Sequence, residues 1–260
     1  MKSVDTVDLK STLRFVGIGS SPIVNIYTYI YILIEILSNS KNCNFRKLTI
    51  FMKQIKINLE QLLLSNAYLG DNSSFLNEKL KPYLLGYKNG FHILNISFTL
   101  WQLKLLVNFI LNIVSLRQKI LIVKELDFFQ FNKLLSIPNV FYYDKKWIGG
   151  VLTNFRIVRK SEKFLEDNKY PNKLASMRFL PSLVFLLDIN LSRWALNEAS
   201  NLEIPISAVI NSNSVNFNIV NYPVIGNNMS FEALYLYLNI IKNAVLKGKQ
   251  KERLNILRIL

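Results

Sequence analysis

The fold of this chain is decided between residues 182 and 210, which read SLVFLLDINLSRWALNEASNLEIPISAVI. Ser182 to Leu187 is a largely apolar run that ends in a carboxylate, Asp188, and Ile206 to Ile210 is a second such run. Short continuous apolar runs are typical of strands that are buried on both faces of a parallel sheet. The intervening residues Leu191 to Asn201 predict a helix, so the segment forms a strand–helix–strand unit.

The same alternation continues on both sides of this unit. Upstream, Lys119 to Val123 is rich in β-branched residues, and apolar side chains recur at helical spacing from Ser97 to Leu116. Strands that alternate with helices predict the α/β class, here a Rossmann-like (flavodoxin-like) parallel sheet in three layers. The other predicted elements are a helix from Asp127 to Ser136, short strands at Asn139 to Tyr142 and Tyr222 to Val224, and a closing helix from Ser230 to Leu246 capped by Ser230.

Three smaller features stand apart from this alternation. Asn89-Gly90 separates the apolar runs Tyr83 to Tyr87 and Phe91 to Leu94, which predicts a small β-hairpin. The polar, charged stretch between Phe155 and Phe179 predicts a short helical protrusion. Residues 247–260 are basic and predict a loosely attached helix.

Composition favours a polyanionic partner. The chain carries 32 Lys+Arg against 17 Asp+Glu, a net charge of +15 over 260 residues. The single Cys43 cannot form an intrachain disulfide, and the lone His92 leaves no Cys/His cluster, so no metal site is expected. The 30 Asn against 7 Ala and 9 Gly indicate an AT-rich gene, as in many organelle genomes.

The amino-terminal region contains an apolar segment, Ile23 to Leu37. It is 15 residues long and is interrupted by Asn25 and Glu35, whereas a bilayer span needs about 20 predominantly apolar residues. We therefore expect no membrane span here, but a helix that packs on the domain or on a neighbouring protein. No import signal is evident, because the first fourteen residues contain two aspartates and one arginine.

The strongest candidate for a binding site is residues 146–156, which read KWIGGVLTNFR. A flat aromatic ring, paired glycines with accessible amides and clustered cations together suit nucleic acid. Thr153-Asn154 offers a cap for a following basic helix. The RNA-binding residues that we predict, with the hairpin lysines as a second patch, are Lys145, Lys146, Trp147, Arg156, Arg159 and Lys160, and Lys79, Lys81 and Lys88.

An enzyme is the main alternative, since open α/β sheets often bind ligands at the carboxyl ends of their strands. The chain has neither a G-x-G-x-x-G nor a G-x-x-x-x-G-K-[ST] motif. Asp188 could be a catalytic carboxylate or a metal ligand, but at a strand end it more often bonds local backbone. His92 lacks a nucleophile partner in any recognisable motif. We expect no catalytic residue and no cofactor, and the alternative is a degenerate α/β enzyme that binds a phosphorylated ligand at Gly149-Gly150.

Three segments, in order, carry a resemblance to a known family. The first is residues 81–95, KPYLLGYKNGFHILN, and the second is residues 147–155, WIGGVLTNF. The third begins at residues 180–190, LPSLVFLLDIN, and continues through Glu198-Ala199, Ile204-Pro205-Ile206, Asn211-Ser212-Asn213 and residues 222–228, YPVIGNN. Together they resemble the universal small-subunit ribosomal protein two family over about residues 58–247.

The resemblance implies a structural constituent of the small ribosomal subunit that supports translation. Family members bind ribosomal RNA on the solvent side, between head and body, next to other small-subunit proteins, and a homo-oligomer is not expected. The resemblance also implies a division into an N-terminal extension (1–57), an α/β domain (58–246) and a basic tail (247–260). Bacterial members carry a long coiled-coil hairpin within that domain. Here only about 25 residues separate Phe155 from Leu180, so residues 155–180 are expected to form a shortened protrusion.

Departures from the family pattern bear on where the protein works. Residues 66–71 read NAYLGD where the family has a Gly-His-Phe-Gly-His-like stretch, so both imidazoles are missing. Asn211 replaces an acid. This drift, together with the AT-rich composition, predicts an organelle-encoded protein of the mitochondrial ribosome, located in the matrix. A plastid or an AT-rich bacterium is the alternative source.

Overall fold

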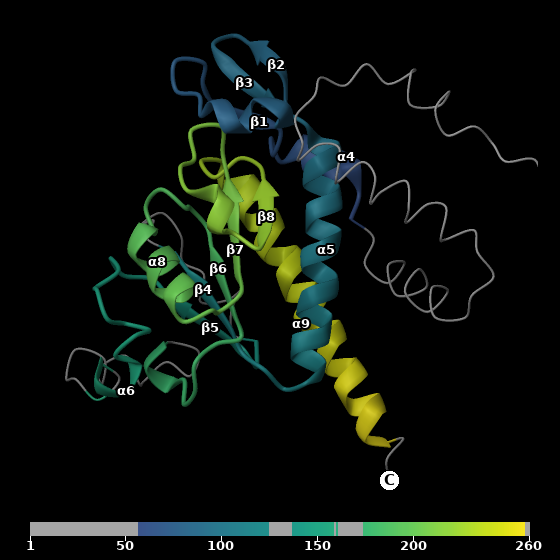
Figure 1. Cartoon of the computed structure of the whole chain (residues 1–260). Helices are drawn as coiled ribbons and strands as arrows, with labels where there is room; N and C mark the ends of the chain where they lie inside the picture. Colours follow the sequence, from purple (N-terminus) through teal and green to yellow (C-terminus); the bar gives the residue numbers. More distant parts are fainter. Residues whose placement is uncertain (1–56, 125–136, 159, 161–173, 258–260) are drawn as a thin grey trace, which may run out of the picture. The chain divides into compact units, whose positions relative to one another are not determined.

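The computed structural model describes residues 57–124, 137–158, 160 and 174–257 (Figure 1). The predictions for the N-terminal extension, including Ile23 to Leu37, for the helix from Asp127 to Ser136 and for most of the protrusion therefore fall outside the described residues.

A five-stranded parallel sheet forms the centre of the described domain. Its strand order is β5-β4-β6-β7-β8, and every neighbouring pair is parallel. Numbered along the chain within this sheet, the order is 2-1-3-4-5, which is that of flavodoxin-like folds. The predicted fold class is therefore confirmed. The strands are β4 (Ile120–Val123), β5 (Val140–Tyr143), β6 (Leu183–Leu186), β7 (Ile206–Ile210) and β8 (Tyr222–Ile225).

Helices cover the two faces of this sheet (Figure 1). Helix α8 (Arg193–Asn201) packs on one face, where its Ala195, Leu196 and Ala199 join alternate residues of β4, β6 and β7 in one buried cluster. Helices α5 (Ile96–Ser115) and α9 (Phe231–Leu257) pack against each other, and α5 also packs against β8. The hydroxyl of Thr99 donates to the carbonyl of Ile225 at 2.6 Å and so fastens α5 to the end of β8.

Helix α5 alone among the described helices is long and apolar enough to cross a bilayer. Half of its apolar window is buried inside the fold, as expected for the core helix of a folded domain, which passes the same test. Asn95 is the N-cap of this helix, and its side-chain oxygen accepts a hydrogen bond from the backbone N–H of Ser97.

A second, antiparallel sheet has the order β1-β3-β2, with β1 (Leu69–Asn72), β2 (Leu84–Lys88) and β3 (Phe91–Leu94). Asn89 and Gly90 have φ of 53° and 81°, the pair of positive values that a two-residue type I′ turn requires. The predicted hairpin of β2 and β3 is confirmed, and β1 adds a strand that the sequence did not reveal. Shorter elements are α4 (Leu59–Leu64), α6 (Phe155–Val158) and the 3₁₀ helices η1 (Glu78–Tyr83), η4 (Leu174–Ser176) and η5 (Phe217–Ile219).

Helix α9 is longer than the sequence suggested. We predicted that it ends at Leu246 and that a loosely attached helix follows, but it runs without a break to Leu257. This prediction of the helix end is wrong, because Gly248 does not stop the helix. A Cβ at Gly248 would lie 2.8 Å from the Cβ of Val114, so glycine lets α9 approach α5 closely.

Candidate nucleic-acid interface

The loop after β5 is anchored by Trp147. Its side chain is 4% exposed and meets the ring of Tyr143 edge-on, with 5.0 Å between the ring centroids. The indole N–H donates to Oε1 of Glu198 on α8 at 3.0 Å. The flat ring that the sequence offered to RNA therefore belongs to the core, and the RNA contact predicted for Trp147 loses its main physical reason.

Glu198 is the centre of this loop. Its Oε1 also accepts the backbone N–H of Gly150 at 2.7 Å, and its Oε2 accepts those of Leu152 at 2.8 Å and Thr153 at 3.2 Å. Gly150 has φ of 94°, a left-handed conformation that favours glycine and turns the loop back around the carboxylate. We call this arrangement the Glu198 clamp: one carboxylate and the four N–H donors of Trp147, Gly150, Leu152 and Thr153.

The clamp sets the ionisation of Glu198. Burial alone would raise the pKa of this carboxyl, but the hydrogen bonds from Trp147 and from the backbone of Leu152, Gly150 and Thr153 outweigh burial and hold the pKa below its ordinary value. Glu198 is thus an anion bound by its own protein. The amide of Gly150 is occupied, so our interpretation of this amide as a donor to a polyanion is wrong. A phosphorylated ligand at Gly149-Gly150 would have to displace the carboxylate.

The predicted cations lie on the surface around this loop and on the hairpin. Lys145 and Lys146 are exposed before Trp147, and Arg156 and Lys160 are exposed after the loop. Arg159 falls outside the described residues, so its predicted pairing with Arg156 stays a prediction. The hairpin lysines Lys79, Lys81 and Lys88 are exposed on η1 and β2.

One buried cluster includes neighbours of cations in both groups. Leu80, which lies between Lys79 and Lys81, belongs to the same cluster as Trp147 and Leu152. This cluster includes α8, so η1 and the loop after β5 pack over the α8 side of the sheet. Lys79 and Lys81 therefore flank a residue of the cluster that also holds the loop after β5, whereas Lys88 lies on β2, which has no residue in this cluster.

Polar side chains gather at the carboxyl edge of the sheet. Asp188 is 8% exposed, and its Oδ1 accepts the backbone N–H of Asn190 at 2.7 Å and of Leu191 at 3.3 Å, while its Oδ2 accepts the amide of Asn228 at 2.8 Å. Asn228 in turn accepts the amide of Asn211 at 2.7 Å. The expectation that Asp188 bonds local backbone is confirmed. Burial raises the pKa of Asp188, and the nearby Asp71 adds to this shift, against its three hydrogen bonds.

The small antiparallel sheet is fastened to this edge. His92 on β3 shares a 3.1 Å hydrogen bond between Nδ1 and the hydroxyl of Ser212, and that hydroxyl accepts the N–H of Asp71 at 2.9 Å. The amide of Asn213 donates to Asp71. His92 is 5% exposed, so it is a satisfied structural residue, as expected. Across the described ranges, no group of three or more His, Cys, Asp or Glu side chains could hold a metal ion.

Glu198 is the residue at the site that sequence reasoning missed. It appeared in the motif Glu198-Ala199 without a role, since nothing in a single sequence pairs a helix residue with a loop about 50 positions upstream. One signal was available. An acid in the helix Leu191 to Asn201, at a position between Ala195 and Ala199 on its buried side, needs a partner inside the fold.

Comparison with known proteins gives consistent results. The family model described as ribosomal protein S2 matches residues 62–173 and 161–248. Among similar proteins, the small ribosomal subunit protein uS2 of Pseudoalteromonas atlantica is 29% identical over 225 residues, covering 75% of this chain and 92% of that protein. The uS2 proteins of Shewanella piezotolerans and Buchnera aphidicola are 29% and 28% identical, covering 75% and 76% of this chain and 93% and 95% of their own lengths.

These similar proteins come from bacteria, which corrects one expectation. We predicted an organelle-encoded protein of the mitochondrial matrix from the AT-rich composition and the drift of motifs. That localisation is wrong, because the similarity is to bacterial proteins and points to a bacterial ribosome. Codon bias acts on the gene whatever the compartment, so composition was a poor guide to location.

Proposed function

Since the chain belongs to the ribosomal protein S2 family, we propose that its basic loop and hairpin bind small-subunit ribosomal RNA. The family is a structural one, so the chain is a protein of the small ribosomal subunit and not an enzyme. Its partners there are ribosomal RNA and neighbouring ribosomal proteins. Its contribution to translation is to hold RNA in place, and no chemical step is assigned to it.

The observation that carries the RNA proposal is the rigid mounting of exposed cations. Lys145 and Lys146 are exposed directly before Trp147, which is buried and bonded to Glu198. Arg156 is exposed directly after Phe155, which is buried in the same cluster. Cations on a fixed backbone can meet phosphates with little loss of conformational entropy on binding. Lys79 and Lys81, which flank Leu80 of the same cluster, and Lys88 on β2 form the second patch of this proposal.

The RNA partner is folded, so shape and phosphate contacts dominate over the reading of bases. The burial of Trp147 fits this view, because base stacking is not the role that its ring has here. We further propose that the protein sits on the solvent side of the subunit, between head and body. Residues 58–246 would be the RNA-binding domain, with residues 1–57 and 247–260 as additions to it.

The test is the salt dependence of binding to small-subunit RNA by the full chain. The double variant Lys145→Gln/Lys146→Gln should reduce the slope of log K against log salt by about two, since each lost phosphate contact removes about one unit. The matched control is Lys104→Gln/Arg193→Gln, which removes the same charge from α5 and α8 and should change the slope far less. Equal slopes for all three proteins would refute this surface.

A further inference from the structure

We propose that one face of α9, from its middle towards its C-terminal end, is a second RNA-binding surface, formed by a stripe of three cations: Lys242, Lys249 and Arg253. We call it the α9 stripe. The proposal rests on the RNA-binding function proposed above. It concerns a different part of the molecule, which lies largely beyond the residues matched by the family model, since that match ends at residue 248.

The stripe follows from the continuity of α9. At about 100° per residue, positions 242, 249 and 253 fall within about 40° of one another around the helix, and Arg253 lies about 16 Å further along the axis than Lys242. Arg253 is exposed, and Lys242 and Lys249 are partly exposed. Had the helix ended at Leu246 as predicted, these three side chains would not share a face.

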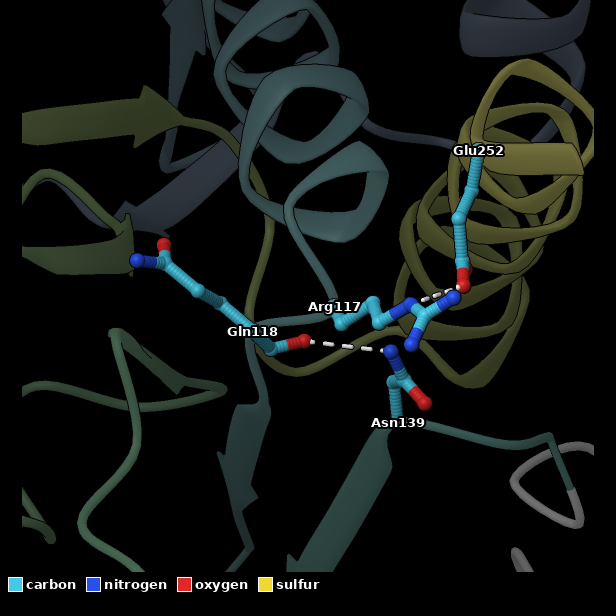
Figure 2. Close-up of polar contacts among 4 residues, drawn as sticks. All are labelled: Arg117, Gln118, Asn139 and Glu252. Atoms are coloured by element: carbon cyan, nitrogen blue, oxygen red, sulfur yellow. Dashed lines mark hydrogen bonds and ion pairs between the residues drawn. The ribbon is translucent and has the colours of Figure 1, made fainter. Parts of the chain in front are cut away.

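The extension is held against α5, so the stripe has a fixed position. Gly248 is buried on the side of α9 that faces α5, where a Cβ built on it would lie 2.8 Å from the Cβ of Val114. Beyond it, Nε of Arg117 donates to Oε1 of Glu252 at 2.7 Å (Figure 2), and Nζ of Lys251 reaches Oδ1 of Asn112 at 3.5 Å.

Arg117 is itself placed by the end of α5. It has φ of 61°, its N–H donates to the carbonyl of Val114 at 3.0 Å, and that of Gln118 donates to Ile113 at 3.0 Å. This is the Schellman arrangement, in which a left-handed residue closes a helix. Figure 2 shows the amide of Asn139 bonded to the carbonyl of Gln118, at 3.3 Å, which ties the same turn to the start of β5. The anchor of α9 is therefore part of the folded domain.

The charge around the stripe is of one sign. Helix α9 contains two acids, Glu232 at its first turn and Glu252. Glu252 is engaged by Arg117, and Glu232 is bonded to Ser230, at the far end of the helix from the stripe. In the part of the chain that the structure describes, no carboxylate forms an ion pair with the stripe. The uncompensated cations give this end of the molecule a positive potential.

The chemistry of the stripe favours RNA over an acidic protein. Protein interfaces are depleted of lysine and are built around buried aromatic or aliphatic anchors. Among the side chains of α9 that the structure describes from Lys242 onwards, the large apolar ones that are exposed are Leu246 and Leu254, at 42% and 59%, and they lie about 12 Å apart along the helix axis. Surfaces that bind phosphates are made of lysine and arginine on regular elements. The stripe has this composition.

The test uses the full chain, small-subunit RNA and the double variant Lys249→Gln/Arg253→Gln. We expect its salt slope to fall by about two relative to the parent protein, while Lys104→Gln/Arg193→Gln, with the same change in net charge, leaves the slope nearly unchanged. These are exposed or partly exposed side chains, so circular dichroism should show an unchanged fold.

The outcomes separate the two proposals. If the parent chain does not bind the RNA, the proposed function fails. If the parent binds and the stripe variant keeps the full slope, the stripe proposal alone is overturned. If the variant keeps the slope on free RNA but is no longer incorporated into small subunits, the stripe contacts an acidic protein instead, which also overturns the proposal.

Discussion

Two buried carboxylates, Glu198 and Asp188, show how the same chemical group takes opposite roles at the residue scale. Both are 8% exposed. Glu198 receives four N–H groups, which lower its pKa despite its burial, whereas burial dominates at Asp188 and raises its pKa. Ionisation of Glu198 therefore favours the folded state, and ionisation of Asp188 opposes it.

This contrast predicts different costs for two isosteric substitutions. Glu198→Gln should reduce the free energy of unfolding by about 2–4 kcal/mol at neutral pH, because its amide would face buried N–H donors and leave them unsatisfied. Asp188→Asn should cost less, about 1–2 kcal/mol, since it removes a buried charge and keeps the acceptor for Asn190 and Leu191 but leaves one donor, the amide of Asn228, without its partner. Urea unfolding with an unchanged m-value measures both.

The pH dependence of the same variants provides the control. The folded pKa of Glu198 is lowered, so its stabilisation is fully present above the ordinary Glu pKa of about 4.3 and is lost as the pH falls through the folded value. The difference in stability between the parent and Glu198→Gln should therefore shrink on acidification. A difference that stays constant from neutral pH down to pH 3 would show that the charge of Glu198 is not what holds the loop.

The same residues mark how far sequence reasoning reached. The local bonds of Asp188 were predicted, because a carboxylate at a strand end has backbone donors within two or three residues. The burial of Trp147 was not predicted, since an aromatic side chain next to two lysines in the sequence can lie either on the surface or in the core. The deciding contact, from Trp147 to Glu198 at 3.0 Å, joins residues that only the tertiary fold brings together.

At the scale of elements, local patterns predicted most helices and strands well. The strand Ile206 to Ile210 and the hairpin around Asn89-Gly90 carry their own signals, in apolar run and turn chemistry. The predicted end of α9, at Leu246, was wrong because Gly248 and the basic residues around it resemble the signals that end a helix. The close approach to Val114 accounts for that glycine, and such a contact is invisible in the local sequence.

Gly248→Ala tests this account of α9. An alanine Cβ would lie 2.8 Å from the Cβ of Val114 and 3.4 Å from the carbonyl of Leu111, so the two helices must separate. The cost of overpacking, about 1–3 kcal/mol, should exceed the gain in helix propensity of about 1 kcal/mol. We expect a net loss of up to about 2 kcal/mol in the free energy of unfolding, measured by thermal denaturation.

Gly149→Ala is the matched control, because a Cβ there meets nothing within 4 Å. It should leave stability within about 0.5 kcal/mol. A Gly248→Ala protein as stable as the parent, or more stable, would show that α9 and α5 are not in tight contact and would weaken the fixed position of the α9 stripe.

At the scale of the whole described domain, the small antiparallel sheet closes the edge at which α/β enzymes bind ligands. Hydrogen bonds of Ser212, Asn213 and Asp71 join the antiparallel sheet to the loop after β7. The parallel sheet and its helices were predicted from the periodicity of apolar residues and from the resemblance, and the hairpin of β2 and β3 was predicted from the turn residues Asn89-Gly90. The position of the hairpin at the carboxyl edge of the parallel sheet was not predicted, because its contacts with residues 211–214 span more than 100 positions of sequence.

Sedimentation of this chain with ribosomal particles from the cells that produce it tests its place in the small subunit most directly. We expect the chain to migrate with the small subunit and to be released as monovalent salt is raised, since contacts between cations and phosphates weaken with salt. A chain that stays with the free proteins at the top of the gradient, even at low salt, would contradict its assignment as a constituent of the small subunit.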